Sequence, residues 1–147
     1  MSRKAKKEPA PTIRGTPGPV ELNVYGVPAP QGSKRHVGHG IMVESSKKVK
    51  PWREAVKAAY PIPGSGIVGA CSVVVTFWVP APKNAKAGDL PAKRPDLDKL
   101  LRSTMDALAD VGAFEDDSRV VRMVAEKRYA CAGRIPGAHI VVQEVSR

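Results

Sequence analysis

Hydrophobic residues alternate with polar ones in some stretches of the chain and recur at helical spacing in others, which predicts both strands and helices. Residues 20–27 alternate in this way, with Leu22 and Val24 on the apolar side, and are expected to form the first strand. The apolar stretch 41–43 is expected to be the return strand of a hairpin. Residues 67–79 are rich in β-branched residues and are expected to form a long central strand.

A further long strand is expected at residues 118–130, where the alternating set Val121, Met123 and Ala125 predicts one buried face. Residues 51–60 are expected to form a helix that begins at a proline. Its inner face comprises Trp52, Val56 and Ala59. Trp52 could instead stack on a nucleobase, but an aromatic residue at helical spacing is more typical of a core.

The strongest helical signal covers residues 96–109, because five apolar residues recur there at intervals of three and four. Asp96 is well suited to the N-cap, and Gly112 is expected to end the helix. The apolar residues are Leu97, Leu100, Leu101, Met105 and Leu108. Together these elements predict an α+β domain, in which two main helices pack on a mixed sheet of about five strands.

The composition indicates a single basic domain. The 147 residues carry 24 Lys and Arg against 14 Asp and Glu, a net charge of +10, which favours a polyanionic partner. Residues 1–19 are rich in lysine and proline and are expected to be a disordered tail, with the folded domain at 20–147. No apolar stretch is long enough for a membrane span or resembles a secretory signal, and the two cysteines form no framework, so a cytoplasmic location is expected.

Half of the acidic residues are concentrated in one short segment of this basic chain. Like charges held close together repel, and a bound divalent cation such as Mg²⁺ is one reason to gather them. The start of the helix and the start of the following strand could converge and bring these carboxylates together. Acidic residues also complement a helix N-terminus and are common in turns, so each one alone has an ordinary structural explanation. The segment contains Asp96, Asp98, Asp106, Asp110, Glu115, Asp116 and Asp117.

A long polar loop, residues 80–94, leads directly to Asp96. Its basic residues are Lys83, Lys86, Lys93 and Arg94. Long loops within a domain are often functional, and cations beside carboxylates suit a phosphodiester substrate, although a plain connecting loop remains an alternative.

Two motifs in this region resemble the signature of the RusA-type Holliday junction resolvases. That family has a Pro-Asp-x-Asp-Asn-x-x-Lys pattern, an Asp-Ala-Leu and a later Asp-Asp-x-x-Val. A weaker similarity covers about residues 20 to 146, including Gly26 to Arg35 and closing strands near residues 127–129 and 136–145. The matching segments here are Arg94-Pro-Asp-Leu-Asp-Lys-Leu-Leu-Arg-Ser-Thr-Met-Asp-Ala-Leu108 and Phe114-Glu-Asp-Asp-Ser-Arg-Val-Val121.

The resemblance implies a homodimeric endodeoxyribonuclease, of bacterial and more specifically phage or prophage origin, that resolves four-way DNA junctions with Mg²⁺ or Mn²⁺. It implies that Asp96, Asp98 and Asp117, rather than Asp116, hold the metal and that Arg102 assists catalysis. The residues expected to contact DNA are Lys34, Arg35, Lys83, Lys86, Lys93, Arg94 and Lys99.

This chain departs from the family pattern at two positions. Lys99 replaces the asparagine, and Arg102 replaces the catalytic lysine. An arginine keeps the charge but does not release a proton readily, so only the electrostatic role is expected to persist. Two other functions fit the sequence: a less specific metal nuclease that cuts flaps or other branched DNA, and a DNA-binding protein without catalysis.

Overall fold

The computed structural model describes the backbone of residues 18–32, 39–64 and 66–146, and the side chains of all of these except residues 39–46. The expected disordered tail lies almost entirely outside this part of the chain, as do Lys34 and Arg35. The elements in order are β1 (Val20–Tyr25), α2 (His39–Ala59), β2 (Cys71–Pro80), α3 (Leu97–Asp110), the 3-10 turn η2 (Asp117–Arg119), β3 (Val120–Ala130) and β4 (Gly137–Glu144).

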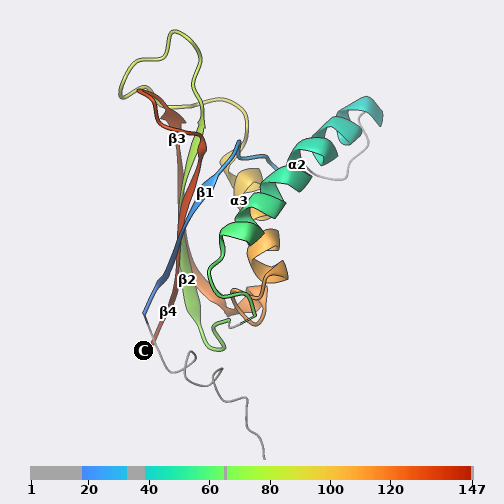
Figure 1. Cartoon of the computed structure of the whole chain (residues 1–147), viewed down its shortest axis with the longest axis vertical. Coiled ribbons are helices and arrows are strands. Elements are labelled where there is room, and N and C mark those ends of the chain that lie inside the picture. Colours follow the sequence, from blue (N-terminus) through green and yellow to red (C-terminus); the bar gives the residue numbers. More distant parts are fainter. Residues whose placement is uncertain (1–17, 33–38, 65, 147) are drawn as a thin grey trace, which may run out of the picture.

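The strands form one mixed sheet in the order β1-β4-β2-β3. The β4 strand pairs antiparallel with both β1 and β2, whereas β3 runs parallel to β2 and is an edge strand. Both helices lie on the same side of the sheet (Figure 1). The α+β class is thus confirmed, and the described residues contain four strands where about five were expected.

The core lies between the helices and the covered face of the sheet. From Val73 to Val79 of β2, every second side chain is buried, and the intervening ones on the opposite face are only partly buried. The buried β2 residues facing the helices are Val73, Val75, Phe77 and Val79. Leu22 and Val24 of β1 join them, as the alternation of the first strand predicted. Within the described residues, the other face of the sheet carries no helix (Figure 1).

The two helices are held to each other through Trp52 and Thr104. The Trp52 side chain is 1% exposed, and its Nε1 donates a hydrogen bond to Thr104 Oγ1 at 3.1 Å. Arg53 of α2 forms an ion pair with Asp110 at the end of α3, at 2.7 Å. Trp52 is therefore a core residue, as its helical spacing predicted, and it is not available to stack on a base.

We expect Trp52→Ala to lower the free energy of unfolding by about 3–5 kcal/mol, because it removes a large buried side chain and leaves a cavity. Trp52→Phe retains an aromatic ring and should cost less than the alanine variant. Its main loss is one hydrogen bond, since Thr104 Oγ1 still donates to Leu100 O at 2.9 Å. Urea denaturation of both variants measures the difference, and equal losses would contradict this assignment of the core.

Two predicted elements differ from the structure. Residues 41–43 are not a hairpin strand but part of α2, which begins twelve residues before the expected proline start. Pro51 lies inside this helix, where it removes the one hydrogen bond that its N–H would have made to the carbonyl of Lys47. A single missing bond does not end a helix whose later residues are anchored in the core, as Trp52 and Val56 are.

The strand at 118–130 begins at Val120, and its expected buried face is wrong. Val121 is 62% exposed and Met123 is 43% exposed. The cause is the position of β3 at the sheet edge, where packing partners are present on one flank only. The central strand likewise begins at Cys71 rather than residue 67, because Ile67 forms an isolated bridge with Phe114 instead of joining β2.

Candidate functional site

The start of α3 presents two acidic side chains to solvent. Asp96 occupies the N-cap position, and its backbone carbonyl accepts hydrogen bonds from the N–H groups of Lys99 and Leu100. Its carboxylate makes no capping bond and lies 3.6 Å from Lys99 Nζ instead. Asp98 follows in the first turn, exposed and without a hydrogen bond or ion pair to any other described side chain. Both charges are favoured by the helix dipole, and both remain accessible to a ligand.

Arg102 lies one turn beyond Asp98 on α3, the spacing at which two side chains share a helix flank. It is exposed and, within the part of the chain that the structure covers, forms no ion pair. Its guanidinium is therefore available to an external anion near Asp96 and Asp98.

Lys127 of β3 fixes the segment that enters this site, and sequence reasoning missed it. Its Nζ donates to the carbonyl oxygens of Lys93 and Pro95, both at 2.6 Å. The end of the cationic loop is thereby tied to β3 immediately before Asp96. The signal was present in the sequence, because a lysine lay on the face of residues 118–130 that was expected to be apolar.

The segment after β1 also docks beside the start of α3. Ser103 Oγ donates to the Ala29 carbonyl at 2.7 Å, and Gln31 N–H donates to the Lys99 carbonyl at 3.0 Å. The chain that continues towards Lys34 and Arg35 therefore departs from a point next to Lys99. Those two predicted DNA-binding residues lie outside the described residues.

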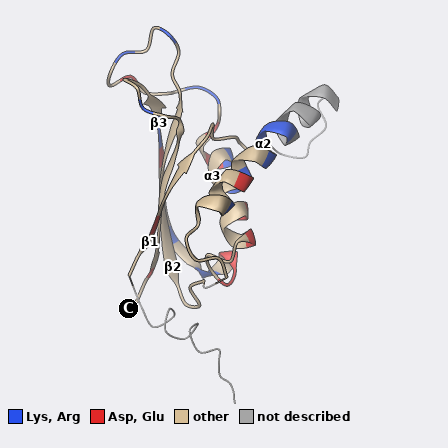
Figure 2. Cartoon of the chain, viewed as in Figure 1, with Lys and Arg blue, Asp and Glu red and all other residues tan. Residues whose placement is uncertain are grey.

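The cationic loop between β2 and α3 extends beyond the end of the sheet, and its basic residues are exposed (Figure 2). It contains tight turns of its own, in which Asp89 accepts a hydrogen bond from the Lys86 N–H at 2.8 Å. An open hollow of about 300 Å³ lies where the two ends of the loop meet the rest of the domain. Pro80 and Tyr129 line one part of it, and Lys93 and Arg94 line another. The loop thus places several cations on the approach to Asp96.

The second acidic group, which contains Asp116 and Asp117, lies at the opposite end of α3 (Figure 2). Asp98 is the second of the fourteen residues of α3, a helix roughly 21 Å long at 1.5 Å per residue, and Asp116 and Asp117 follow its end. The β3 strand then runs back along the sheet, so its start is far from Asp96 and its end is near it. The expected convergence of Asp96 and Asp98 with Asp116 and Asp117 is therefore wrong within one chain. Among the described residues no three acidic, histidine or cysteine side chains are grouped so that they could hold a metal ion.

Asp116 and Asp117 have different roles at this distant end. Asp116 is the N-cap of η2, and its carboxylate accepts hydrogen bonds from the Ser118 N–H and hydroxyl. These bonds, chiefly that of the hydroxyl, hold the pKa of Asp116 below its usual value. Asp117 is exposed, and its side chain contacts no hydrogen-bond or ion-pair partner among the described residues. Of the two, Asp117 is the carboxylate left available to a ligand.

The turn that carries Asp117 is held by close backbone packing. Gly112 has a φ of +78°, the left-handed conformation usual just after a helix. A Cβ on Gly66 would lie only 2.2 Å from the Gly112 carbonyl oxygen. Two backbone hydrogen bonds then secure the turn: the Ile67 N–H donates to the Ala113 carbonyl and the Glu115 N–H donates to the Ile67 carbonyl, both at 3.0 Å. The position of Asp117 at the far end of α3 is thus structurally fixed.

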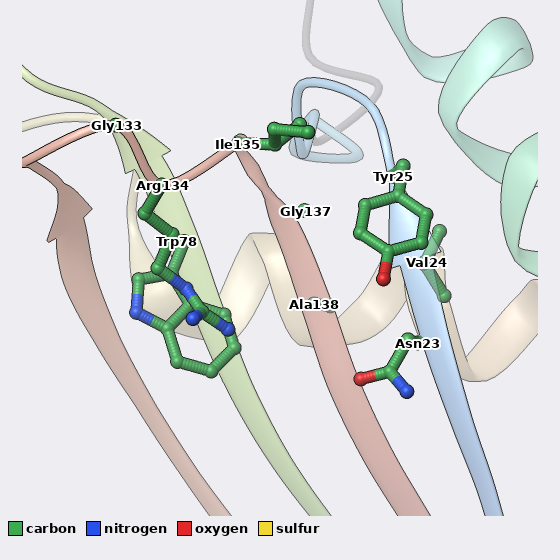
Figure 3. Close-up of a pocket in the computed structure, with 9 residues that line it drawn as sticks. All are labelled: Asn23, Val24, Tyr25, Trp78, Gly133, Arg134, Ile135, Gly137 and Ala138. Carbon is green, nitrogen blue, oxygen red and sulfur yellow. The ribbon is translucent and has the colours of Figure 1, made fainter.

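A second hollow lies on the uncovered face of the sheet (Figure 3). The Arg134 guanidinium lies over the Trp78 ring, 3.5 Å from its centroid, and Tyr25 lies across the hollow from this pair (Figure 3). None of the residues that line it is acidic. The chemistry of the site is therefore assigned to the start of α3, where carboxylates and cations occur together.

Residues 25–143 of the chain match the protein family described as Endodeoxyribonuclease RusA. The match covers most of the chain, including the cationic loop, all of α3 and the Asp117 turn, so the chain belongs to this family of endodeoxyribonucleases. No curated protein matches it closely. Within the described residues, no helix is both long and apolar enough to cross a membrane.

Proposed function

We propose that the protein is a divalent-metal-dependent, homodimeric endonuclease that resolves four-way DNA junctions by hydrolysing phosphodiester bonds. The observation that carries this proposal is the juxtaposition of Asp96 and Asp98 with an exposed cationic loop in a chain of an endodeoxyribonuclease family. The loop supplies the counter-charge for phosphates, and the carboxylates supply oxygen ligands for a hard cation. A bacterial cytoplasm, in the host if the gene is carried by a phage, is the setting that we propose.

The residues at the start of α3 fit Mg²⁺ in its usual mode. Mg²⁺ is typically held by one or two carboxylates together with substrate phosphate and water, and Asp96 and Asp98 provide two. When bound, the cation polarises the phosphate and favours attack by water. Mn²⁺ has similar ligand preferences and is expected to substitute. A third carboxylate, Asp117, is not near these two in the same chain.

The protein side chains contribute position and charge. Arg102 neutralises negative charge that develops on the phosphate oxygens, a role for which the guanidinium geometry is suited. Lys99 Nζ lies 3.6 Å from the Asp96 carboxylate, and this lysine would contact the DNA backbone. Lys127 positions the loop end and, because it is committed to two carbonyls, does not itself bind DNA.

The decisive experiment compares cleavage of a four-way junction with cleavage of a linear duplex of the same arms, with and without Mg²⁺. Magnesium-dependent cuts placed symmetrically in the junction, with the duplex left intact, are the expected result. Equal cleavage of junction, flap and duplex would favour the less specific nuclease. Binding without cleavage at any metal concentration would favour a non-catalytic DNA-binding protein.

We expect removal of three loop charges, in Lys83→Ala/Lys86→Ala/Lys93→Ala, to weaken junction binding and to flatten its dependence on salt. Each lost phosphate contact should reduce the slope of log affinity against log salt by roughly 0.9. The matched control is Lys47→Ala/Lys48→Ala/Lys50→Ala, which removes the same charge from exposed positions on α2. Fluorescence anisotropy at several salt concentrations gives both slopes. Equal slopes for the two triple variants would mean that only net charge matters and that the loop does not touch DNA.

A further inference from the structure

We propose that the hollow on the uncovered face of the sheet is a second DNA site, in which one unpaired nucleobase stacks between Tyr25 and the Trp78–Arg134 pair. The hollow is open and has a volume of about 250 Å³. Its ligand is single-stranded rather than duplex DNA, because a base within a duplex is stacked on its neighbours and cannot enter. The inference goes beyond the proposed cleavage, since this binding needs neither a metal nor the carboxylates.

The first support is the spacing of the two aromatic side chains (Figure 3). Tyr25 of β1 and Trp78 of β2 both pair with Gly137 of β4, so they lie on either side of it on one face of the sheet. Neighbouring strands lie about 4.7–4.9 Å apart, which separates the two aromatic positions by about 9.5 Å. A Cβ at Gly137 would collide with the Val24 carbonyl oxygen, so backbone packing keeps the space between them free of a side chain. This gap admits one flat ring that contacts both sides at about 3.5–4.0 Å.

The second support is the chemistry of the groups that line the hollow. Tyr25 is 67% exposed and Trp78 is only partly buried, so both rings are accessible. The Arg134 guanidinium lies over the Trp78 ring and has no ion-pair partner among the described residues. Aromatic rings and arginine planes are the groups on which the bases of single strands usually stack. Asn23 adds an amide that can donate to or accept from the edge of a base.

The third support is the charge around the hollow. No acidic residue lines it, and the cationic loop begins where β2 ends, two residues beyond Trp78. Glu126 lies further along this face, and its charge is offset by Arg128 at 3.2 Å. Glu21 lies further still and is bonded to His139 at 2.6 Å. The surroundings of the hollow therefore favour the phosphates that flank a bound base.

The hollow lies at the same end of the sheet as the start of α3. Trp78 pairs with Arg128 of β3 on the uncovered face. The preceding residue, Lys127, points to the helix side, where it is bonded to the Pro95 carbonyl immediately before Asp96. The two sites thus lie on opposite faces at one end of the sheet, and a DNA strand that passes round this end contacts both.

Binding of single strands by Tyr25 variants tests the site. The probe is a fluorescein-labelled oligothymidylate of about ten nucleotides, a length within the usual range for such sites, and anisotropy is measured on the full chain in EDTA. Tyr25→Ala should raise the dissociation constant for this strand by about tenfold, the scale for loss of one stacked base, and leave that for a duplex of equal length unchanged. Tyr25→Phe retains the ring and should bind like the wild type.

The matched control is Val68→Ala, which truncates another exposed side chain at the other end of the sheet and should bind the strand normally. Equal losses for Tyr25→Ala and Val68→Ala would overturn the inference, as would equal losses on single strand and duplex. A wild-type chain that does not bind the single strand would do the same. Tyr25→Ala that becomes monomeric by light scattering, with single-strand binding unchanged, would show that a second copy fills the hollow instead.

Substitutions of Arg134 separate stacking from charge. Arg134→Ala should weaken binding of the strand and reduce the slope of log affinity against log salt by about 0.7, the value for one phosphate contact on single-stranded DNA. Arg134→Lys keeps the charge and the slope but lacks the planar group, and should bind less tightly than the wild type. Wild-type affinity in Arg134→Lys would contradict stacking on the guanidinium.

Tryptophan fluorescence reports on the hollow directly, because the chain has two tryptophans and Trp52 is buried. A base stacked in the hollow should quench Trp78, so oligothymidylate should lower the emission of the wild type and leave that of Trp78→Phe unchanged. Equal quenching in both proteins would place the bound base elsewhere. Since these measurements need no metal, a chain that cuts no junction would refute the proposed function alone. A chain that cuts junctions but binds single strands equally well with Tyr25→Ala would refute this inference alone.

Discussion

Asp98→Asn should abolish junction cleavage while leaving junction binding intact or tighter. The substitution preserves side-chain size but removes one anionic ligand from the start of α3, where no other described carboxylate except Asp96 lies close by. The expected loss in rate is at least roughly 10³-fold, the upper scale for loss of one preorganised charge-stabilising contact. Binding should not suffer, since a negative charge near the phosphates is removed. Asp96→Asn and Asp117→Asn should behave in the same way.

The matched control is Asp89→Asn, which removes a carboxylate from the adjoining loop. Its amide oxygen can still accept the hydrogen bond from the Lys86 N–H, so the loop should keep its turn. Single-turnover cleavage and anisotropy on the same junction separate catalysis from binding. Near-normal cleavage by Asp98→Asn or Asp96→Asn would refute the metal assignment.

The sequence predicted α3 almost to the residue, because the signals for this helix are local. Five apolar residues at helical spacing mark its inner face, all of them buried or partly buried, while Asp96 marks its start and Gly112 its end. The burial of Trp52 and Val56 followed from the same kind of spacing. The spacing of apolar residues within a helix does not depend on which elements pack beside it. A helix predicted from that spacing therefore agrees with the structure.

Predictions that depended on neighbouring elements were less successful. The alternation of Val121 and Met123 with charged residues is typical of a strand with one buried face, yet β3 lies at an edge and exposes both. Three lysines, Lys47, Lys48 and Lys50, precede Pro51, and a proline is typical of a helix start, so the sequence predicts that the helix begins at Pro51 although this residue lies inside α2. The position of β3 at the sheet edge and the length of α2 both depend on tertiary packing.

The acidic residues illustrate a different difficulty. Their expected convergence requires the strand to begin beside the start of α3, whereas the strand follows the end of this 14-residue helix. A strand that returns alongside that helix must begin at its far end, which the helical rise alone implies. This geometry keeps Asp117 away from Asp96 and Asp98 within one chain.

Arg102 marks the point at which this chain differs from its family, and its substitutions should separate two catalytic roles. If the side chain only stabilises charge on the phosphate, Arg102→Ala should slow cleavage by about 10²–10³-fold and Arg102→Lys should keep most of the activity. If proton donation matters, Arg102→Lys should cut faster than the wild type, because lysine releases a proton far more readily than arginine. We expect the first result, since Arg102 is exposed one turn beyond Asp98 and is free of ion pairs within the described chain.

Lys99→Ala provides the comparison, because Lys99 is another cation in the first turn of α3 but lies next to Asp96 rather than on the flank of Asp98. It should weaken binding moderately and leave the rate of the bound complex nearly unchanged. Single-turnover rates at saturating enzyme, measured from neutral to alkaline pH, compare all three variants directly. Normal cleavage by Arg102→Ala together with a large loss in Lys99→Ala would contradict the assignment and place the catalytic cation three residues earlier on the helix.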